Sequence, residues 1–378
     1  MIFAPTSIEE LADILGEATA RRQTLAVTGT GSKPGLGPGG ADARLDLAGL
    51  GHSIRHDPDE LLLTASAATP LAEIQAVLAR AGQCLAFEPP SPDAIWSGGD
   101  GTLGGTVACA LSGPRRPFAG AARDHVLGLT GVTGRGEIFR AGGKVLKNVT
   151  GFDLPRLLTG ARGSLAVMTE ITVKVLPLAP AQATLRIAVD RPAAAVSLLA
   201  AALKVDGGIT GAAWVDGAAL LRVESTAAAL PALIDAARAR IPGGEVIEDT
   251  GSRAIWASVG SLAGAIGAEE IVWRCPLPAA RAPALVAALP DQAVVRLDWA
   301  GALAWVILPP ALADCDVHAA MAAAAGRDGH AERLRGPASA VPARLAPEPA
   351  LAALSARIKA SFDPAGILSP GTTPGVTA

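Results

Sequence analysis

The sequence predicts an α+β protein of two domains, a glycine-rich first domain and a second domain built from a repeated unit. Its 378 residues exceed the length of one ordinary domain. Half of the residues are hydrophobic and 18% are charged, which excludes disorder and allows large buried cores. A strand–helix–hairpin pattern occurs twice between residues 181 and 345, which predicts an α/β sheet with helices on one face, built by internal duplication.

The first domain, residues 1–180, alternates short strands and helices with glycine-rich loops. Ser7 is placed to cap a helix over 8–20, with Glu9 and Glu10 favourably located in its first turn. Apolar periodicity predicts a second helix over 71–81, and small residues predict a third. The expected strands are 24–28, 61–65, 126–133 and 171–176, and the third helix is 106–111. Pro177 ends the last strand.

The second domain, residues 181–345, follows a hinge at 177–180. In its first copy we expect a strand at 183–189, a helix at 192–204 and a hairpin at 211–224 that turns at Asp216–Gly217. In the second copy we expect a strand at 271–274, a helix at 279–289 and a hairpin at 293–308 that turns near Ala300–Gly301. A last helix is expected at 350–362.

Charge and cysteine spacing exclude several classes of protein. The 32 basic and 35 acidic side chains give a net charge of −3, so the sequence lacks the excess of basic residues that is typical of nucleic-acid-binding proteins. Four cysteines lie far apart, without a C-x-x-C pair, so we expect neither a disulfide framework, nor an iron–sulfur cluster, nor another metal site. They are Cys84, Cys109, Cys275 and Cys315. The acidic amino terminus is unlike a secretory signal, and no run approaches the roughly 20 apolar residues of a membrane span. We therefore expect a cytoplasmic protein, with association to the inner membrane only through partners.

Two glycine clusters indicate a ligand that approaches the backbone closely. The first, Gly29-Thr30-Gly31-Ser32, follows a strand and forms either a simple turn or an anion nest for a pyrophosphate, with Lys33 nearby. It is neither a G-x-G-x-x-G fingerprint nor a Walker loop. The second cluster, 98–108, is so rich in glycine that ordering it on folding costs much conformational entropy. This cost is best explained if an extended ligand must lie close against the backbone.

Taken in order, the glycine-rich segments resemble the flavin-binding domain of the vanillyl-alcohol oxidase and p-cresol methylhydroxylase (PCMH) superfamily. Within it they resemble in particular the family of FAD-binding subunits of bacterial glycolate oxidases. The segments are residues 29–33, 98–108, 112–116, 120–128, 142–154 (GGKVLKNVTGFDL) and 158–170. The resemblance is strong over 1–180, weak through the middle and returns at 362–371 (FDPAGILSPG). It implies a PCMH-type FAD-binding domain at 1–180, a cap domain at 181–345 and a segment at 346–378 that returns to the FAD domain.

The resemblance also implies which residues bind FAD. It assigns the pyrophosphate to Gly29, Thr30, Gly31, Ser32 and Lys33, and the path towards the flavin ring to Thr102, Leu103, Gly104, Gly105 and Ala108. Gly113, Arg123 and Asp124 fall where relatives line the flavin or brace that lining, and an Arg123–Asp124 structural ion pair is the equal alternative. Gly163 and Val167 fall in a segment that offers backbone groups to the adenine or the ring edge.

Three departures from the family pattern matter. Relatives that bind FAD covalently carry a histidine in the pyrophosphate loop, whereas His52 and His56 lie outside this loop, so we expect non-covalent FAD. Ala166 replaces a frequent glycine, and Ser369 replaces the asparagine of a terminal Asn-Pro-Gly. These two replacements leave the individual contacts open but not the fold.

The catalytic residues are not identified by the sequence. A 2-hydroxy-acid dehydrogenase needs an arginine for the carboxylate and a base or metal for the hydroxyl proton. Relatives use an Asp-Gly-Asn-x-His motif, but here only Arg327-Asp328-Gly329-His330 occurs, which we read as a solvated turn in preference to a degenerate site. His125 is expected to be packed or at the surface. Lys144 and Lys147 either meet an anionic substrate or face solvent or a partner.

The route of the electrons points to a complex. Without iron–sulfur cysteines or an NAD fingerprint, a reduced flavin would pass electrons to oxygen, a quinone or another protein. The resemblance implies a second flavin subunit and an iron–sulfur subunit as partners. The pair Arg115-Arg116 and four tryptophans of the second domain would then serve a docking surface, with buried core as the alternative for the tryptophans. The tryptophans are Trp256, Trp273, Trp299 and Trp305.

The leading hypothesis is therefore the FAD-binding subunit of a glycolate oxidase complex, which oxidises glycolate to glyoxylate by hydride transfer to flavin. One alternative is a stand-alone FAD-dependent dehydrogenase of another 2-hydroxy acid, such as D-lactate. Another is a scaffold subunit that keeps the fold without useful flavin chemistry. A sugar-nucleotide reductase on the same fold is poorly supported, because it would need an NADPH route and a proton-donating Ser or Cys.

Overall fold

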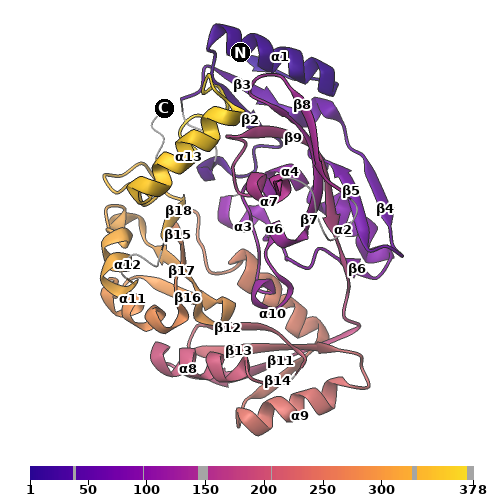
Figure 1. The fold of residues 1–378 in the computed structure, drawn as a ribbon. Helices are drawn as coiled ribbons and strands as arrows, with labels where there is room; N and C mark the ends of the chain where they lie inside the picture. Colours follow the sequence, from indigo (N-terminus) through magenta and orange to yellow (C-terminus); the bar gives the residue numbers. More distant parts are fainter. Residues whose placement is uncertain (37–39, 97, 144–151, 206, 326–329, 373–378) are drawn as a thin grey trace. The chain divides into compact units, whose positions relative to one another are not determined.

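The structure is a computed structural model that describes residues 1–36, 40–96, 98–143, 152–205, 207–325 and 330–372 (Figure 1). Lys144, Lys147 and the segment 327–329 lie outside the described residues. The chain divides into two compact units. The first unit comprises residues 1–112, 120–178 and 346–378, and the second comprises residues 113–119 and 179–345. The short segment 113–119 thus belongs to the second unit, although it lies within the first domain of the sequence.

The first unit contains two larger sheets and a short ribbon. The first sheet is parallel, in the order β1 (Ile2–Phe3), β3 (Ala43–Asp46), β2 (Leu25–Thr28). The second is antiparallel, in the order β4 (Ile54–Asp57), β5 (Leu62–Ser66), β9 (Ala166–Lys174), β7 (Val126–Thr133), β8 (Ile138–Gly142), and β6 (Gln83–Cys84) pairs with β10 (Leu176–Pro177). The helices are α1 (Ile8–Arg21), α2 (Leu71–Arg80), α3 (Pro92–Trp96), α4 (Leu103–Ala108), α6 (Ala122–His125), α7 (Leu154–Leu158) and α13 (Pro349–Phe362), with 3-10 turns η1 (Pro34–Leu36) and η2 (Leu47–Leu50).

The amino-terminal helix forms as its sequence predicts. The Ser7 side chain accepts a hydrogen bond from the backbone N–H of Glu10 and so satisfies one of the free donors of the first turn. Leu11 and Leu15 recur at helical spacing and are fully buried in a core that also contains Leu25 of β2. This packing fixes the position of β2, from which the first glycine-rich loop departs.

The predicted helix at 106–111 begins earlier than expected, because α4 runs from Leu103 to Ala108. Thr102 caps it, with its hydroxyl accepting from the N–H of Gly105 at 3.1 Å. Gly104 lies in this helix and packs against another backbone: a Cβ there would lie 2.8 Å from the carbonyl oxygen of Ala67. Glycine at this position therefore permits the close packing of α4. Similarly, β9 begins five residues before the expected 171–176 strand.

The chain end is held in the first unit by a buried ion pair. Lys359 of α13 donates to Asp363 Oδ2 at 2.5 Å and to the carbonyl oxygens of Ser164 and Leu368 at 2.7 and 2.9 Å. Asp363 also accepts from the backbone N–H groups of Ile367 and Leu368, at 3.0 and 2.8 Å. Leu368 forms a parallel bridge with Leu25 of β2. These bonds place the tail beside the first sheet.

The second unit contains an eight-stranded antiparallel sheet with a mirrored strand order, which confirms the predicted fold class and its duplicated unit. The order is β14 (Glu245–Glu248), β11 (Ala181–Ala188), β13 (Ala218–Ser225), β12 (Ile209–Val215), β16 (Val294–Asp298), β17 (Leu303–Leu308), β15 (Ile271–Pro276), β18 (Glu332–Arg335). The two copies meet where Trp214 of β12 pairs with Leu297 of β16. The hairpins turn at residues 216–217 and 299–302, as the sequence predicts.

Helices cover both faces of this sheet, whereas the sequence predicted helices on one face only. The helices are α5 (Arg116–Ala119), α8 (Pro192–Ala202), α9 (Leu230–Arg240), α10 (Asp249–Ser261), α11 (Ala282–Ala288) and α12 (Val317–Ala325), with 3-10 turns η3 (Ala279–Arg281), η4 (Trp299–Gly301) and η5 (Pro310–Leu312). Helices α8, α9, α11 and α12 pack into the main core. On the opposite face, Trp256 and Val259 of α10 pack on Ala213 and Leu220 (Figure 1). The sequence of β13 does not reveal this second covered face. Its residues on that side are apolar or form ion pairs, so the strand lacks the alternation of apolar and polar residues that marks a sheet with one face in solvent.

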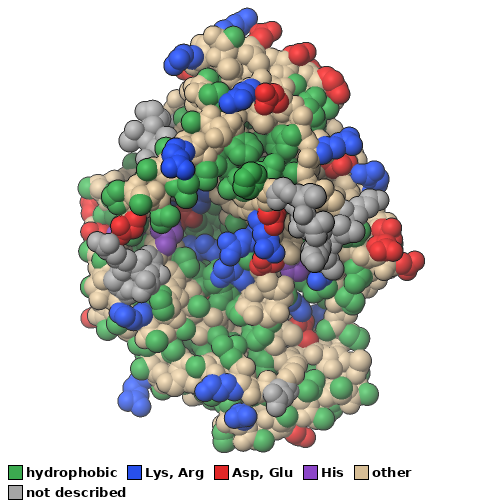
Figure 2. Space-filling model, in the orientation of Figure 1, with side chains coloured by type: hydrophobic (Ala, Val, Ile, Leu, Met, Phe, Trp, Pro, Cys, Tyr) green, Lys and Arg blue, Asp and Glu red, His purple; other side chains and the backbone are tan. Residues whose placement is uncertain are grey.

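The four tryptophans proposed for a docking surface are all buried. Trp256, Trp299 and Trp305 are 3% exposed and Trp273 is 1% exposed, so within the second unit they are core residues. On the face shown in Figure 2, charged side chains of both signs are scattered among hydrophobic ones, in keeping with the net charge of −3. No helix among the described residues is long and apolar enough to cross a bilayer.

Replacing Lys359 by Met should destabilise the first unit strongly. Asp363 would then be a buried carboxylate without its cation, a loss of about 3–5 kcal/mol in the free energy of unfolding. Urea denaturation of the full chain measures it. Arg357→Met is the matched control, because Arg357 lies on the same helix but is exposed, and it should shift the unfolding free energy by no more than about 0.5 kcal/mol. Equal effects of the two changes would contradict the anchoring role of Lys359.

Candidate functional site

The loop after β2 lies directly against the second glycine cluster. The Thr30 hydroxyl donates to the carbonyl oxygen of Asp100 at 2.8 Å. A Cβ at Gly98 would lie 2.4 Å from the carbonyl oxygen of Ser32, so only glycine permits this approach. Gly31 adopts a φ of +70°, in the left-handed region. The two clusters, nearly seventy residues apart in sequence, thus build one wall of small residues and exposed backbone.

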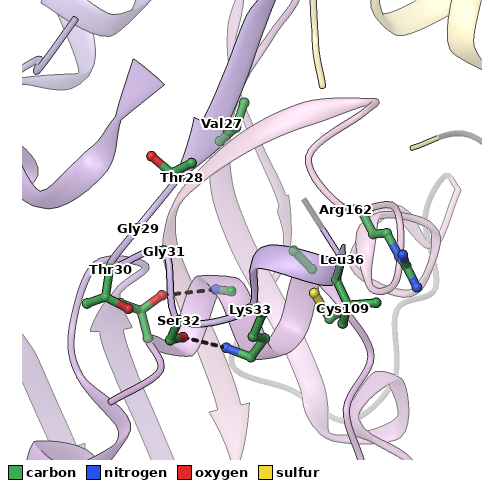
Figure 3. Close-up of a pocket in the computed structure, with 13 residues that line it drawn as sticks. Val27, Thr28, Gly29, Thr30, Gly31, Ser32, Lys33, Leu36, Cys109 and Arg162 are labelled. Carbon is green, nitrogen blue, oxygen red and sulfur yellow. Dashed lines mark hydrogen bonds between the residues drawn. The ribbon is translucent and has the colours of Figure 1, made fainter. Parts of the chain in front are cut away.

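A half-buried ammonium group lies at this wall. Lys33 folds back so that its Nζ lies 3.2 Å from Ser32 Oγ, its one hydrogen bond among the described residues (Figure 3). A Cβ built at Gly105 would lie 3.6 Å from the same Nζ, which places the ammonium beside α4. Burial lowers the pKa of Lys33, because the charged form loses solvation, and the nearby Cys109 thiol offsets this effect only in part. An anion at this position would restore the lost stabilisation of the charge.

Two adjoining cavities follow the wall, and their empty space, open mouths included, is about 550 and 460 Å³. They share part of their lining: Val27, Gly29, Thr102, Gly105, Ala108 and Arg162. The first cavity is also lined by Thr28, Thr30, Gly31, Ser32, Lys33, Leu36 and Cys109 (Figure 3). The second is also lined by Leu47, Ala67, Gly104, Gly163, Ala166, Val167 and Met168.

Most of the residues that the sequence singled out for FAD line these cavities. They are Gly29, Thr30, Gly31, Ser32, Lys33, Thr102, Gly104, Gly105, Ala108, Gly163 and Val167. Leu103 instead points into the core of the first unit and is fully buried. Gly113 belongs to the second unit, where its carbonyl oxygen accepts from Trp299 Nε1 at 2.9 Å.

Arg123 and Asp124 are exposed and line neither cavity. Asp124 Oδ2 accepts from the N–H of Ala121 at 2.9 Å and so caps α6. Its ion-pair partner is Arg156, at 3.7 Å, and not its neighbour Arg123. The structure therefore gives Asp124 a local capping role.

Several lining residues were not singled out from the sequence, notably Arg162 and Cys109. Arg162 has a φ of 54°, and its N–H donates to the carbonyl oxygen of Ala108 at 2.9 Å, which brings the two segments together. Its position just before Gly163 in a glycine-rich segment was an available signal. Cys109 lies one helical turn after Gly105, so helical spacing from the glycine would have found it.

The tail contributes a further polar group. Ser369 is 1% exposed with a φ of 43°, and its Oγ has no hydrogen-bond partner in the described structure. A Cβ at Gly163, which lines the second cavity, would lie 3.3 Å from this oxygen. A buried hydroxyl without a partner is costly, so a ligand that hydrogen-bonds it would be favoured. Ala166, the other departure from the family pattern, lines the second cavity.

The lining suits a long anionic ligand with an apolar end. Glycine-rich backbone, the Lys33 ammonium and the Arg162 guanidinium surround the first cavity, and the combined lining contains no carboxylate. The further lining of the second cavity consists of apolar side chains and glycines. These features fit the diphosphate and the flat apolar ring of FAD, so the residues present are suited to this cofactor.

No residue in the described structure stands out as a catalytic base. His125 is 2% exposed and packs against Phe87 with ring centroids 5.6 Å apart, as expected for a packed histidine. His330 is exposed, and its N–H donates to the carbonyl oxygen of Pro276. Among the described residues there is no cluster of three His, Cys, Asp or Glu side chains that could hold a metal ion.

Comparison with known proteins supports FAD as the cofactor. Residues 1–142 match a protein family described as FAD binding domain. The chain is 35% identical over 371 residues to "Glycolate oxidase subunit GlcE" of Escherichia coli K12, covering 96% of both chains. It is 31% identical over 184 residues to "Glycolate oxidase subunit GlcD" of Bacillus subtilis, covering 49% of this chain and 38% of that one. It is 28% identical over 181 residues to a D-lactate dehydrogenase of Anaerostipes hadrus, of which it covers 36%.

Among solved structures, an alkyldihydroxyacetonephosphate synthase superposes with a TM-score of 0.69 at 14% identity. The match covers 98% of this chain and 76% of that one. At this identity the likeness concerns the fold alone, and it supports the PCMH-type architecture.

Replacing Gly105 by Val should weaken FAD binding while leaving the fold intact. The new side chain would enter both cavities, where its Cβ would lie 3.2 Å from Thr102 Oγ1 and 3.6 Å from Lys33 Nζ. We expect at least a tenfold rise in the Kd for FAD, measured by quenching of flavin fluorescence. The matched control is Gly16→Val, since Gly16 is a helical glycine with open space around it. Unchanged affinity in Gly105→Val would place FAD elsewhere.

Proposed function

The chain belongs to the family of the glycolate oxidase subunit GlcE, and on this premise we propose that it is the FAD-binding subunit of a glycolate oxidase complex that oxidises glycolate to glyoxylate. It is an FAD-dependent oxidoreductase subunit with a PCMH-type FAD-binding domain. The observation that carries the proposal is the carboxylate-free, glycine-walled pair of cavities around Lys33, which suits a diphosphate-containing cofactor.

In the proposed arrangement the loop 29–33 holds the diphosphate through backbone N–H groups and the Lys33 ammonium. Gly104, Gly105 and Ala108 present a surface without bulky side chains along the cofactor, and Gly163 with Val167 lines the apolar end. The proposed lining does not include Leu103, Gly113, Arg123 or Asp124. Because the loop contains no histidine, we propose that FAD is held non-covalently.

FAD supplies a two-electron acceptor for the hydride of the carbon that bears the substrate hydroxyl. The chain's own contribution is to bind and orient: small residues let the cofactor approach the backbone, and apolar residues of the second cavity exclude water from its ring end.

The proposed partners are a second flavin subunit and an iron–sulfur subunit. The names of two relatives, which are glycolate oxidase subunits GlcE and GlcD, support a multi-subunit enzyme. The four cysteines lie far apart in the sequence, so we place the iron–sulfur centre that carries electrons away in a partner subunit.

A second candidate is a dehydrogenase of another 2-hydroxy acid that works without partners. The similarity to D-lactate dehydrogenases favours it, although this chain spans only 36% and 39% of the length of two such enzymes. The two functions differ in whether the isolated chain reduces its flavin with substrate.

A visible spectrum of the purified full chain, before and after anaerobic glycolate, tests the proposal. We expect bound flavin that dissociates on acid precipitation and is bleached by glycolate only when the partner subunits are coexpressed. Bleaching by D-lactate with the chain alone would support the second candidate. A chain that takes up no FAD even when FAD is added would indicate a scaffold and contradict the proposed function.

Replacing Lys33 by Met should weaken FAD binding by about 10- to 100-fold, the range of a charge-assisted hydrogen bond. Burial lowers the pKa of Lys33 in the free chain, and a bound diphosphate would raise it. FAD binding should therefore take up a proton: the affinity is full below the lower pKa of the free chain and falls as pH rises through the higher pKa of the complex. Titrations of FAD affinity against pH measure this.

The Lys33→Met variant should lose this pH dependence, because it has no ammonium to protonate. Lys204→Met is the matched control, since Lys204 is exposed in the second unit and its replacement removes the same charge. A pH profile that persists in Lys33→Met would show that another group titrates.

A further inference from the structure

A loop of the first domain forms part of the second unit. The chain leaves the first unit after Ser112, runs through Gly113–Ala119 and re-enters at Gly120. We call the segment Gly113–Ala119 the crossover loop. Its base is closed within the first unit, where the N–H of Ala122 donates to Ser112 Oγ at 3.0 Å. The loop is therefore anchored at its base in one unit and at its tip in the other.

The tip is held by specific contacts within the second unit. Arg115 forms a two-pronged ion pair with Glu224, with Nη1 and Nη2 at 2.6 and 2.9 Å from the two carboxylate oxygens. Trp299 Nε1 donates to the carbonyl oxygen of Gly113 at 2.9 Å. The Arg116 guanidinium stacks 4.1 Å from the centre of the Trp299 ring.

The Arg115–Glu224 pair is built to hold one geometry. The two side chains are 14% and 2% exposed, and a planar fork on a carboxylate fixes both distance and angle. Glu224 also accepts from the Thr210 hydroxyl and lies 3.6 Å from Arg222 Nε, so the carboxylate is itself oriented by the sheet. A buried pair of this kind provides specificity of position more than net stability.

The loop is also close in sequence to the helix that lines the cavities. Helix α4 ends at Ala108, and only residues 109–112 separate it from the crossover loop. This short linker is folded back, because the N–H of Leu111 donates to the carbonyl oxygen of Thr106 at 3.2 Å. Because this hydrogen bond joins the linker to α4 itself, a displacement of the loop is transmitted to the end of the helix.

We propose that Arg115 and Glu224 are positioning residues that couple the second unit to FAD binding through the crossover loop. The inference rests on the proposed placement of FAD along α4. Coupling between two sites is reciprocal, so FAD bound against α4 orders the crossover loop, and breaking the ion pair in the second unit weakens FAD binding.

The test compares two arginine variants of the full chain. Arg115→Met removes the fork but leaves Glu224 beside Arg222. The matched control is Arg296→Met, which breaks a different ion pair of the same sheet, Arg296 Nη2 to Asp216 Oδ2 at 2.7 Å, away from the loop. We expect Arg115→Met to raise the Kd for FAD at least fivefold, and Arg296→Met to change it less than twofold.

Hydrogen exchange supplies a readout that does not depend on affinity. In the wild-type chain, FAD should slow amide exchange over 113–119, and this protection should disappear in Arg115→Met while it persists in Arg296→Met. Wild-type affinity and protection in Arg115→Met, or equal losses in both variants, would overturn the proposal. If Arg115→Met does not fold, Arg115→Lys keeps the charge without the fork and should show a smaller rise in the Kd.

The Gly105→Val variant separates this inference from the proposed function. If Gly105→Val leaves the Kd for FAD unchanged, the placement of FAD along α4 is wrong and the coupling loses its basis. If Gly105→Val weakens binding and Arg115→Met does not, the placement stands and only the coupling fails.

Discussion

The close approach of two glycine-rich backbones is the constraint on which the first unit depends. At Gly98 and at Gly104 a Cβ would lie 2.4 Å and 2.8 Å from the carbonyl oxygens of Ser32 and Ala67. No other residue type tolerates such contacts. Because these glycines have no side chain, the loop after β2, the end of strand β5 and helix α4 can pack directly against one another. The cavities are the space left along this junction. Its wall of small residues carries no carboxylate, which makes it suitable for an anionic dinucleotide.

A half-buried positive charge gives this wall its chemical preference. Lys33 has lost most of its solvation, and its described partner is a hydroxyl and not a carboxylate. Elsewhere in the unit a buried lysine is fully satisfied: Lys359 has Asp363 and two carbonyl oxygens. The contrast between the two lysines shows why one serves the fold and the other suits a ligand. A half-buried cation whose described partner is a neutral hydroxyl is stabilised further by an anion that arrives from solution.

The second unit is built around its duplicated sheet, and the crossover loop connects it to the first unit. Its duplicated strands give a mirrored sheet in which each copy supplies its own helices, and this part stands as a core of its own. The crossover loop breaks this separation, because Arg115 provides the countercharge for the Glu224 carboxylate of β13. The chain therefore passes between the units repeatedly, and the flavin domain and its neighbour do not form from two independent stretches of sequence.

The sequence by itself determined the duplicated unit, the amphipathic helices and most of the cavity lining, because periodicity, capping and glycine density are local properties. Ser7 caps α1, and the loop 29–33 lines the first cavity, as predicted. Only the tertiary structure decided that Gly113 belongs to the second unit, that Asp124 pairs with Arg156, and that Arg162 reaches the cavity. It also decided that α10 covers the second face of the sheet. Each of these depends on a partner distant in the chain, and the partner of a charged or aromatic side chain is set by packing, which leaves no periodic trace in the sequence.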